Sequence, residues 1–451
     1  MRGGVRSSVR PVTFDLRARG TTVSREVLAG ATTFAAMSYI IVVNPLILAS
    51  TGMDRSGLLL ATVLSAAIST LVMGLWANLP IALAPGMGTN IVFSQILVMQ
   101  MGVSWRSGLA MILLNSLLFL VLSLSRWRQR IVAAFPAPIK LGMQCSIGML
   151  VAYLGLKNGG LIVAGAGGSI SFGSLSDPVV LMITVAIVLT PMLVVLRVPG
   201  ALLISIAGLT LAGLFVRDAH GTPLTQAPAH LFALPSFSSN LILALDLREF
   251  FGDFWKLLPV TLYFLLSEFF AGTTTLLSVT RRAGLLDDRG EIPRARAAFS
   301  ADALASTIGA LLGTTTVTAF AESVTGVEAG GRTGLVAVVV AVLFALSLFA
   351  APLIGAVPVQ NTAPALLLVG ILMLEGLGGM DTARPEAAIP PLAMTIVTAC
   401  TADLMVGLAI GAFVYTGILA GLRQWQRLGP AVLLLDAVLI MYLVLRSLVL
   451  H

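Results

Sequence analysis

Two carboxylates, Glu268 and Glu322, stand inside long apolar stretches, where ionised side chains are rare. A charge at the centre of a bilayer costs about 3 kcal/mol on insertion scales. No Lys or Arg stands near either residue in the sequence to offset that cost. We therefore expect each carboxylate to carry a proton or to accept hydrogen bonds from a polar ligand.

A third acid, Asp302, stands near the start of an apolar segment. In Ser300-Ala301-Asp302 it is expected to be either the N-cap of a helix or a further proton-coupling residue. Other acids near segment ends are predicted to be interfacial or packing groups. These are Glu328, Glu375 and Asp403.

The composition excludes most soluble protein classes. Of the 451 residues, 57% are hydrophobic and only 10% are charged, and the mean hydropathy is +1.00. A soluble domain needs more charge to cover its surface, so lipid is the expected solvent. The two cysteines and three histidines have no spacing typical of a disulfide framework or a metal centre, and we expect no cofactor. The excess of arginine is interpreted as a topology signal rather than as a nucleic-acid surface.

The apolar stretches predict an all-α polytopic membrane protein with about fourteen transmembrane segments, in two sets of seven. A further stretch, 431–450, is expected either to span the membrane or to lie at its surface. The first set is 28–49, 57–77, 79–100, 107–125, 138–156, 178–196 and 200–216. The second set is 254–278, 299–313, 314–329, 333–357, 362–377, 388–402 and 404–421.

The basic residues support this arrangement. If the tail 1–25 is cytoplasmic, most of the 27 Lys and Arg residues fall on that tail and on the loops after even-numbered segments. Lys and Arg gather on cytoplasmic loops of membrane proteins, and one miscounted helix would remove this asymmetry. The sequence therefore predicts a multi-pass protein of a bacterial-type inner membrane with a cytoplasmic N-terminus.

The third and tenth segments are interrupted. The third carries Pro80, Pro85, Gly86 and Gly88 near its middle, and the tenth begins with a threonine-rich run, 314–318, that favours a short strand. Non-helical backbone at membrane depth must be buried in protein or must line a cavity. Interruptions at equivalent places in two halves are typical of a transporter built as an inverted repeat, in which two half-helices face a substrate at the midplane.

A series of short motifs runs in order between about residues 20 and 425. They are Arg25-Glu26-Val27-Leu28-Ala29-Gly30 with Tyr39 through Pro45, Ala77-Asn78-Leu79-Pro80 leading into Ala84-Pro85-Gly86-Met87-Gly88, Gly155-Leu156-Lys157-Asn158, Arg282-Ala283-Gly284-Leu285-Leu286, and Ala329-Gly330-Gly331-Arg332-Thr333-Gly334. Together these motifs resemble those of the AzgA-type purine permeases, a branch of the nucleobase–cation symporter (nucleobase–ascorbate) superfamily.

The resemblance implies a seven-plus-seven inverted repeat whose core domain slides against a gate domain in an elevator-like cycle. It also implies proton symport, a nucleobase-like substrate and a homodimer in the lipid bilayer, with no nucleic-acid partner. The core would comprise 26–125 and 251–357, and the gate 126–217 and 358–421. An extracytoplasmic loop at 218–250 and the apolar C-terminal segment 422–451 complete the expected division.

The resemblance assigns roles to individual residues. Glu268 and Glu322 match acids that hydrogen-bond the nucleobase, and both are candidates for proton coupling. A planar heterocycle presents N–H groups at its edge, which two such acceptors suit, while an apolar wall takes its face. Asn90 is, from its position after the break alone, either a packing amide or a site residue. The other substrate-binding candidates are Phe320 and Ala321 in the strand region, Phe93 after the third-segment break, Thr273 and Ser323.

The sequence departs from the family pattern at two places. The family usually has two aspartates three residues apart in the eighth segment; here the first is Glu268 and the second position is Ala271. After Gly88 the family usually has Leu-Asn-Ala, where this chain has Thr89-Asn90-Ile91. The expected substrate is therefore a purine or a related planar nitrogen heterocycle, and loss of the second acid leaves both the ligand and the coupling open.

The sequence disfavours three other functions. An anion carrier of the same fold is disfavoured because two unprotonated carboxylates would repel an anion. A membrane sensor is disfavoured because no soluble output domain is expected after residue 421. A membrane enzyme is disfavoured because the sequence offers no nucleophile–base pair or metal cluster.

Overall fold

The computed structural model describes residues 14–125, 135–165, 170–217, 221–235, 240–287 and 291–449. Several parts of the predicted regions lie outside these ranges. They are residues 1–13 of the tail, the loop after the fourth apolar segment, 166–169 of the gate part, parts of the 218–250 loop, 288–290 of the core part, and the last two residues of the C-terminal segment.

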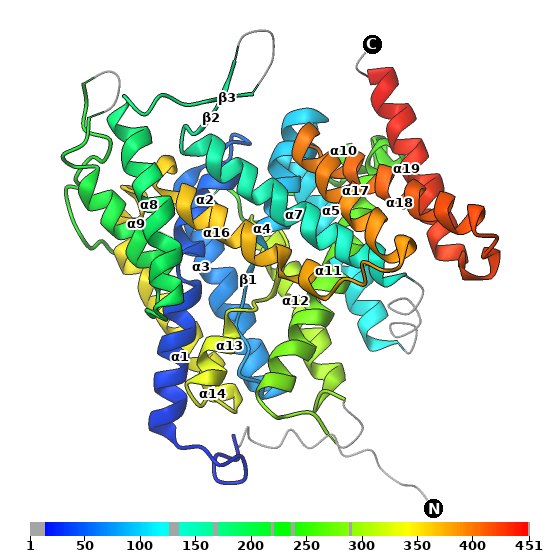
Figure 1. Ribbon diagram of the computed structural model, residues 1–451. Coiled ribbons are helices and arrows are strands. Elements are labelled where there is room, and N and C mark those ends of the chain that lie inside the picture. The colour runs from blue at the N-terminus through cyan, green and yellow to red at the C-terminus, as the bar shows by residue number, and fades with distance from the viewer. Residues whose placement is uncertain are drawn as a thin grey trace, which may run out of the picture.

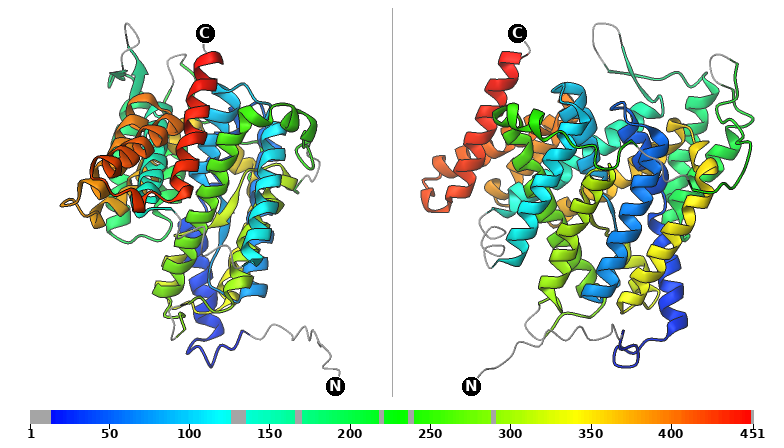
Figure 2. Two further views of the ribbon diagram at one scale, coloured as in Figure 1. Left: turned by 90° about the vertical axis from the view of Figure 1, so that its right-hand side faces the viewer. Right: turned by 180° about the vertical axis from the view of Figure 1, so that it is seen from behind.

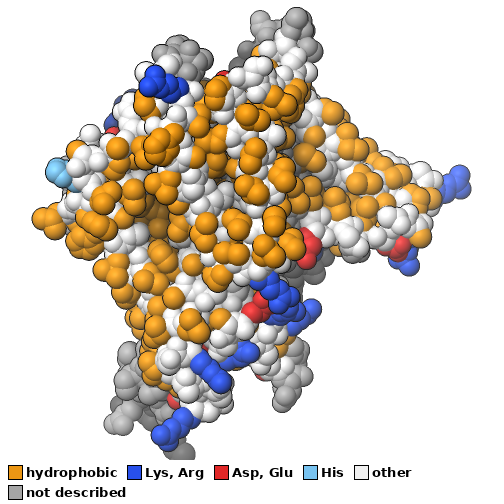
Figure 3. Space-filling model, turned by 60° about the vertical axis from the view of Figure 1, so that its left-hand side comes forward, with side chains coloured by type: hydrophobic (Ala, Val, Ile, Leu, Met, Phe, Trp, Pro, Cys, Tyr) orange, Lys and Arg blue, Asp and Glu red, His pale blue; other side chains and the backbone are white. Residues whose placement is uncertain are grey.

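Long apolar helices dominate the described chain. Within the described ranges, nine helices are long and apolar enough to cross a membrane. Figure 3 shows apolar side chains over much of one face, with basic side chains gathered below them. The prediction of a helical, multi-pass membrane protein is confirmed, and the count of fourteen segments stays a prediction.

The elements follow the predicted segments closely, and their bounds are as follows. The first half contains α1 (Val23–Met37), α2 (Ile40–Ala49), α3 (Arg55–Val72), η1 (Met73–Ala77), β1 (Leu83–Pro85), α4 (Met87–Ile91), η2 (Val92–Gln100), α5 (Trp105–Leu124), α7 (Ala137–Asn158), β2 (Ile162–Ala164), β3 (Ile170–Phe172), α8 (Pro178–Val195) and α9 (Ala201–Ala212). The second half contains α10 (Leu247–Gly252), α11 (Phe254–Arg282), α12 (Ala295–Leu312), β4 (Val317–Ala319), α13 (Ser323–Glu328), α14 (Gly334–Ser347), η4 (Leu348–Ala350), α15 (Ala351–Gly355), η5 (Val359–Thr362), α16 (Ala363–Met373), η6 (Leu374–Gly379), α17 (Pro385–Thr401), α18 (Leu404–Gly421), η7 (Trp425–Arg427) and α19 (Pro430–Val449).

The two interrupted segments meet in a two-stranded ribbon near the middle of the molecule (Figure 1). Strands β1 and β4 pair antiparallel, with Ala84 opposite Thr318. The ladder continues at both ends, because Gly86 N donates to Thr316 O and Phe320 N donates to Ala82 O, each at 2.9 Å. Pairing between the strands satisfies the inner backbone groups of both, which neither segment could do alone at membrane depth.

Two groups of helices lie side by side in the view of Figure 2, left. Helices α7, α16, α17 and α18 pack together in one group. In the other group, α3 packs on α12 and α14, and α12 also packs on α5 and β4. The second group therefore surrounds the ribbon.

Three of the sequence motifs converge where α1 meets the start of α14. Glu26 is fully buried, and its carboxylate accepts hydrogen bonds from Arg332 N at 2.8 Å and from Thr333 N and Oγ1 at 3.1 and 2.6 Å. Asn78, in the left-handed conformation with φ 54°, accepts from Gly334 N at 2.7 Å. These acceptors satisfy free N–H groups at the beginning of α14, as capping requires, so these motifs join distant parts of the chain.

Some elements were not predicted. Strands β2 and β3 form a hairpin between the fifth and sixth apolar segments, and α10 is a short helix within the 218–250 loop and just beyond it. Both consist of short elements with little periodicity to detect. The 431–450 stretch forms one helix, α19, which packs on α18 and α11.

Candidate functional site

The outer edges of the ribbon bind hydroxyl side chains from the two flanking helices. On α3, Thr70 Oγ1 accepts from Leu83 N and donates to Leu83 O, each at 2.9 Å. On α12, Ser306 Oγ accepts from Val317 N at 3.0 Å and can donate to Val317 O at 2.9 Å. An unpaired backbone group in hydrocarbon costs several kcal/mol, so these two hydroxyls stabilise an otherwise open two-stranded ribbon.

Glu268 lies on α11 beside this ribbon and is only 2% exposed. Its Oε1 accepts a hydrogen bond from the Ser306 hydroxyl. Its Oε2 is buried and has no hydrogen-bond partner within the part of the chain that the structure describes. A buried carboxylate oxygen without a donor is costly. Oε2 is therefore the atom that a ligand N–H group would satisfy.

Asp302 supports the strand β4 from inside α12. Its Oδ1 accepts from Ala319 N at 2.9 Å and from Thr318 Oγ1 at 3.0 Å. The prediction that Asp302 could be a helix N-cap is wrong, because α12 already begins at Ala295. Residues 295–298, Ala-Arg-Ala-Ala, form the first turn of the helix, which therefore begins before the apolar stretch that defined the predicted segment.

Helices α11 and α12 lie close together at Gly272. A Cβ atom at this position would overlap the Asp302 carboxylate and would come within 3.4 Å of Thr318 Oγ1. The absence of a side chain therefore lets α11 reach the strand.

We expect Gly272→Ala to lower the thermal unfolding temperature of the purified protein, because overpacking a tight contact costs about 1–3 kcal/mol. The matched control is Gly417→Ala on α18, where a Cβ would meet nothing within 4 Å. Equal unfolding temperatures for both variants would show that α11 can shift away from α12 without cost.

Glu322 immediately precedes α13 and is half-buried. The hydroxyl of Tyr39 donates to Glu322 Oε1 at 2.8 Å. Tyr39 is 1% exposed and stands at the junction between α1 and α2, where the first predicted segment divides into two helices. The break in that segment thus places a phenol against the second candidate acid.

The remaining strand-side candidates have different surroundings. Phe320 is buried, whereas Ala321 is exposed. Ser323 Oγ accepts from Ala82 N at 3.0 Å and thereby binds the start of β1. Thr273 Oγ1 donates to Phe269 O, one turn earlier in α11, at 2.6 Å.

Asn90 belongs to a separate buried polar cluster. It donates to Asn44 Oδ1 and accepts from Thr315 Oγ1, while Asn44 also donates to Thr62 Oγ1 at 2.6 Å and to Thr314 Oγ1 at 3.2 Å. Together these side chains link α2, α3 and α4 to the run before β4. Among the described residues, no hydrogen bond connects Asn90 to either candidate acid.

Phe93 is fully buried in the main hydrophobic core. A Cβ at Gly108 would lie 2.6 Å from Phe93 Cε2, so the ring packs against α5. In this conformation its face is covered by protein.

An exposed stripe of small and hydroxyl side chains runs along α11 from the level of Glu268. Ala271, Thr274 and Ser278 are all exposed, and the helix ends at the exposed pair Arg281 and Arg282. Lipid-facing surfaces carry large apolar side chains, so a stripe of this composition is typical of a helix face that borders water or another protein surface.

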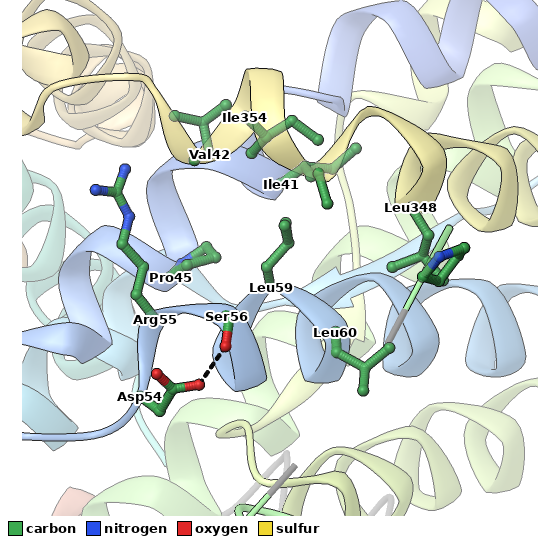
Figure 4. Close-up of a pocket in the computed structure, with 13 residues that line it drawn as sticks. Ile41, Val42, Pro45, Asp54, Arg55, Ser56, Leu59, Leu60, Leu348 and Ile354 are labelled. Carbon is green, nitrogen blue, oxygen red and sulfur yellow. Dashed lines mark hydrogen bonds between the residues drawn. The ribbon is translucent and has the colours of Figure 1, made fainter. Parts of the chain in front are cut away.

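The structure also contains a cavity of about 470 Å³ between α2, α3 and α15 (Figure 4). Its lining is mostly apolar, with Asp54, Arg55 and Ser56 at one end. None of the candidate site residues contributes to it. The candidate acids therefore lie in a different part of the molecule from this cavity.

Two residues at the site were not among the candidates from sequence. Ser306 bonds Glu268, and Tyr39 bonds Glu322. Tyr39 belongs to the Tyr39–Pro45 motif, which was used only for the family resemblance. Ser306 follows Asp302 by one helical turn, and a search for polar residues on one face of α12 would have found it.

The comparisons with known proteins agree with this architecture. A model of the permease family (Xan_ur_permease) matches residues 24–419. The adenine permease AdeP of Escherichia coli is 36% identical over 431 residues, which cover 96% of this chain and 95% of that protein. The guanine/hypoxanthine permease PbuO of Bacillus subtilis is 34% identical over 426 residues, which cover 93% and 97%.

Among solved structures, the transmembrane domain of the cyanobacterial bicarbonate transporter BicA has the same fold, with a TM-score of 0.60 at 15% identity. The match covers 89% of this chain and 98% of that domain. The sequence relatives and the fold thus agree, and the chain is a member of the Xan_ur_permease family of permeases.

Proposed function

We propose that this protein is a secondary active transporter that takes up a purine nucleobase, or a related planar nitrogen heterocycle, by proton symport. The observation that carries the proposal is the buried Oε2 of Glu268, which lacks a donor within the described residues and lies beside the ribbon. Relatives whose names specify adenine, guanine or hypoxanthine support the ligand class.

In this proposal, two acids on different elements bind the edge of the heterocycle. Glu268 Oε2 accepts one N–H group, and the Glu322 carboxylate, oriented by Tyr39, accepts another. The exposed residue Ala321 lies between the strand end and Glu322, where its backbone would suit the polar edge of a base. The other proposed contacts are Phe320, Thr273 and Ser323, with Asn90 and Phe93 shaping the site from the third segment.

The transport cycle that we propose is an elevator-like slide of a core domain against a gate domain. The core comprises 26–125 and 251–357, and the gate comprises 126–217 and 358–421. The exposed stripe on α11 provides the route by which substrate leaves Glu268 toward the arginine end of the helix. We further propose a homodimer in a bacterial-type inner membrane, with the N-terminus in the cytoplasm.

The first experiment is a binding panel on the purified protein. Thermal shift is measured with purines, pyrimidines, other small nitrogen heterocycles and inorganic anions. Stabilisation by a purine supports the proposal. Stabilisation by an anion alone, with no response to any heterocycle, would contradict it and would favour the anion-carrier alternative. A response to a non-purine heterocycle would assign the altered substrate to the lost acid at Ala271.

A protonophore is expected to abolish accumulation of labelled purine in cells that express the protein, because Glu268 and Glu322, with Asp302, would carry the coupled proton. Binding to the purified protein should be unaffected by the protonophore. Accumulation that persists without a proton gradient would contradict symport and would point to another driving ion.

Tyr39→Phe is expected to weaken purine binding by about 10- to 100-fold. It removes a hydrogen bond to a charged group, which is worth about 1.5–3 kcal/mol. Isothermal titration of the variant measures this loss, and Tyr153→Phe on α7 is the control for replacement of a phenol elsewhere. Equal purine affinities for wild type and Tyr39→Phe would show that the hydrogen bond to Glu322 Oε1 does not contribute to the proposed site.

A further inference from the structure

The hydroxyl of Ser306 has three hydrogen-bond partners. It accepts from Val317 N at 3.0 Å, and it lies within donating distance of both Val317 O, at 2.9 Å, and Glu268 Oε1. A serine hydroxyl has one proton and two lone pairs. It can therefore donate to the strand or to the carboxylate, but not to both at once.

We propose that Ser306 is a positioning residue that transmits the protonation state of Glu268 to the strand β4. This inference deepens the proposed function and rests on it, because it concerns the acid that binds the substrate. Ser306 Oγ has one proton for two possible acceptors, and a change of acceptor requires no movement of heavy atoms.

Two arrangements of hydrogens satisfy the geometry. When Glu268 is ionised, Ser306 donates to Oε1, and Val317 O loses its side-chain donor. Val317 and Pro85 form a non-hydrogen-bonded pair of the ladder, so Val317 O points away from β1, and that strand supplies no N–H group to replace the donor.

When Glu268 gains a proton on Oε1, the direction of the hydrogen bond reverses. The carboxylic acid donates to Ser306 Oγ, which still accepts from Val317 N and now donates to Val317 O. Every donor and acceptor of Ser306 Oγ and of the Val317 backbone is then satisfied, the proton that enters on Glu268 remains there, and Oε2 stays available to a ligand N–H group. Strand β4 is thus held best in the protonated state, and it leads directly to Phe320, Ala321 and Glu322.

In the first half of the chain, a hydroxyl side chain binds the outer edge of β1 in the same way, but no acid within the described ranges is bonded to it. Thr70 makes the matching pair of bonds to Leu83 N and O, each at 2.9 Å. Within the described chain, no carboxylate is bonded to Thr70. Thr70 is therefore a matched control that separates support of the ribbon from a response to protonation.

Among the described residues, the side chain that hydrogen-bonds Glu268 is that of Ser306, which carries no charge. Asp302, on α12, is the acid that interacts with it electrostatically. Four other acids on or next to the elements that pack against α11 have contacts of their own: Glu322 with Tyr39, Glu328 with Arg282, Asp436 with Thr416, and Glu249 with Ser104. Lys140 of α7 lies over the ring of Phe270, 5.6 Å from its centroid.

The test is infrared difference spectroscopy of the purified protein in liposomes, titrated with acid and without substrate. The carbonyl band of protonated Glu268 is identified by its loss in Glu268→Gln. In Ser306→Ala we expect this band to move in frequency, because the carboxyl group loses its hydrogen-bond partner. In Thr70→Ala the band should stay where it is in the wild type, although a bond to the ribbon is lost there as well.

An unchanged band in Ser306→Ala, or an equal displacement in Thr70→Ala, would overturn the proposal and leave Ser306 as a strand support alone. Because the measurement needs no substrate, it is independent of the binding panel. If the wild type bound no purine, that result would count against the proposed function. The infrared comparison of Ser306→Ala with Thr70→Ala would still test the role of Ser306.

A second readout is the ratio of purine uptake at mildly acidic pH to that at mildly alkaline pH, under a fixed proton gradient. Thr70→Ala should lower both rates by the same factor and leave the wild-type ratio intact. Ser306→Ala should bring the ratio closer to one, since β4 no longer responds to the proton. A wild-type ratio in Ser306→Ala would contradict the proposal.

Discussion

Replacing Glu268 with glutamine is expected to abolish purine uptake while the protein inserts and folds normally. The substitution keeps the side-chain volume, and the amide can still bond Ser306. It removes the negative charge, one acceptor oxygen and the ability to gain a proton. Loss of a charge-assisted hydrogen bond alone costs about 1.5–3 kcal/mol, so initial uptake should fall by about two orders of magnitude or more once coupling is also lost.

The measurement is initial uptake of labelled adenine and hypoxanthine, normalised to the amount of protein in the membrane. Glu375→Gln is the matched control, because Glu375 is an exposed acid in η6, away from the ribbon. Wild-type uptake by Glu268→Gln would reject Glu268 as a site residue. Loss of uptake in Glu375→Gln as well would show that the effect of Glu268→Gln is not specific to that residue.

Asp302→Ala is expected to destabilise the protein by about 2–5 kcal/mol. The change leaves Ala319 N and the Thr318 hydroxyl without the acceptor that they share. Each buried donor without a partner costs about 1–3 kcal/mol. The thermal unfolding temperature and the yield of monodisperse protein both report the loss.

Asp302→Asn separates support of the strand from proton coupling. An asparagine oxygen can accept the same two hydrogen bonds, so the variant should unfold at close to the wild-type temperature. Since an amide cannot carry the proton, we expect it to lose accumulation driven by the proton gradient. Wild-type accumulation by Asp302→Asn would restrict Asp302 to a structural role.

The sequence predicts the apolar helices and the two acids for one physical reason. Lipid excludes charge and unpaired backbone, so apolar length indicates the helices, and any carboxylate within them stands out. The same reasoning predicts a break between Pro80 and Gly88 and a short strand in the run 314–318, where the structure has β1 and the beginning of β4.

The partners of the acids were not predictable in this way. Tyr39 and Glu322 are 283 residues apart, and Ser306 and Glu268 are 38 apart on different helices. Neither pairing leaves a periodic signal in the sequence. For the same reason the sequence did not indicate that Asn90 bonds Asn44 or that Phe93 packs against α5, because both contacts depend on how helices pack after the chain has folded.

The pairing of β1 with β4 also sets an order of events during synthesis. Ala82 and its partner Ser323 are separated by 241 residues. At about 5–20 residues per second, a ribosome needs roughly 10–50 s to add the intervening chain. During that interval the first strand is already made, but its inner edge has no partner in the nascent protein. Thr70 can bind its outer edge at once, whereas the inner edge must remain hydrated or be held by the insertion machinery until the second half arrives. The ribbon that carries the proposed site is thus completed late in biogenesis.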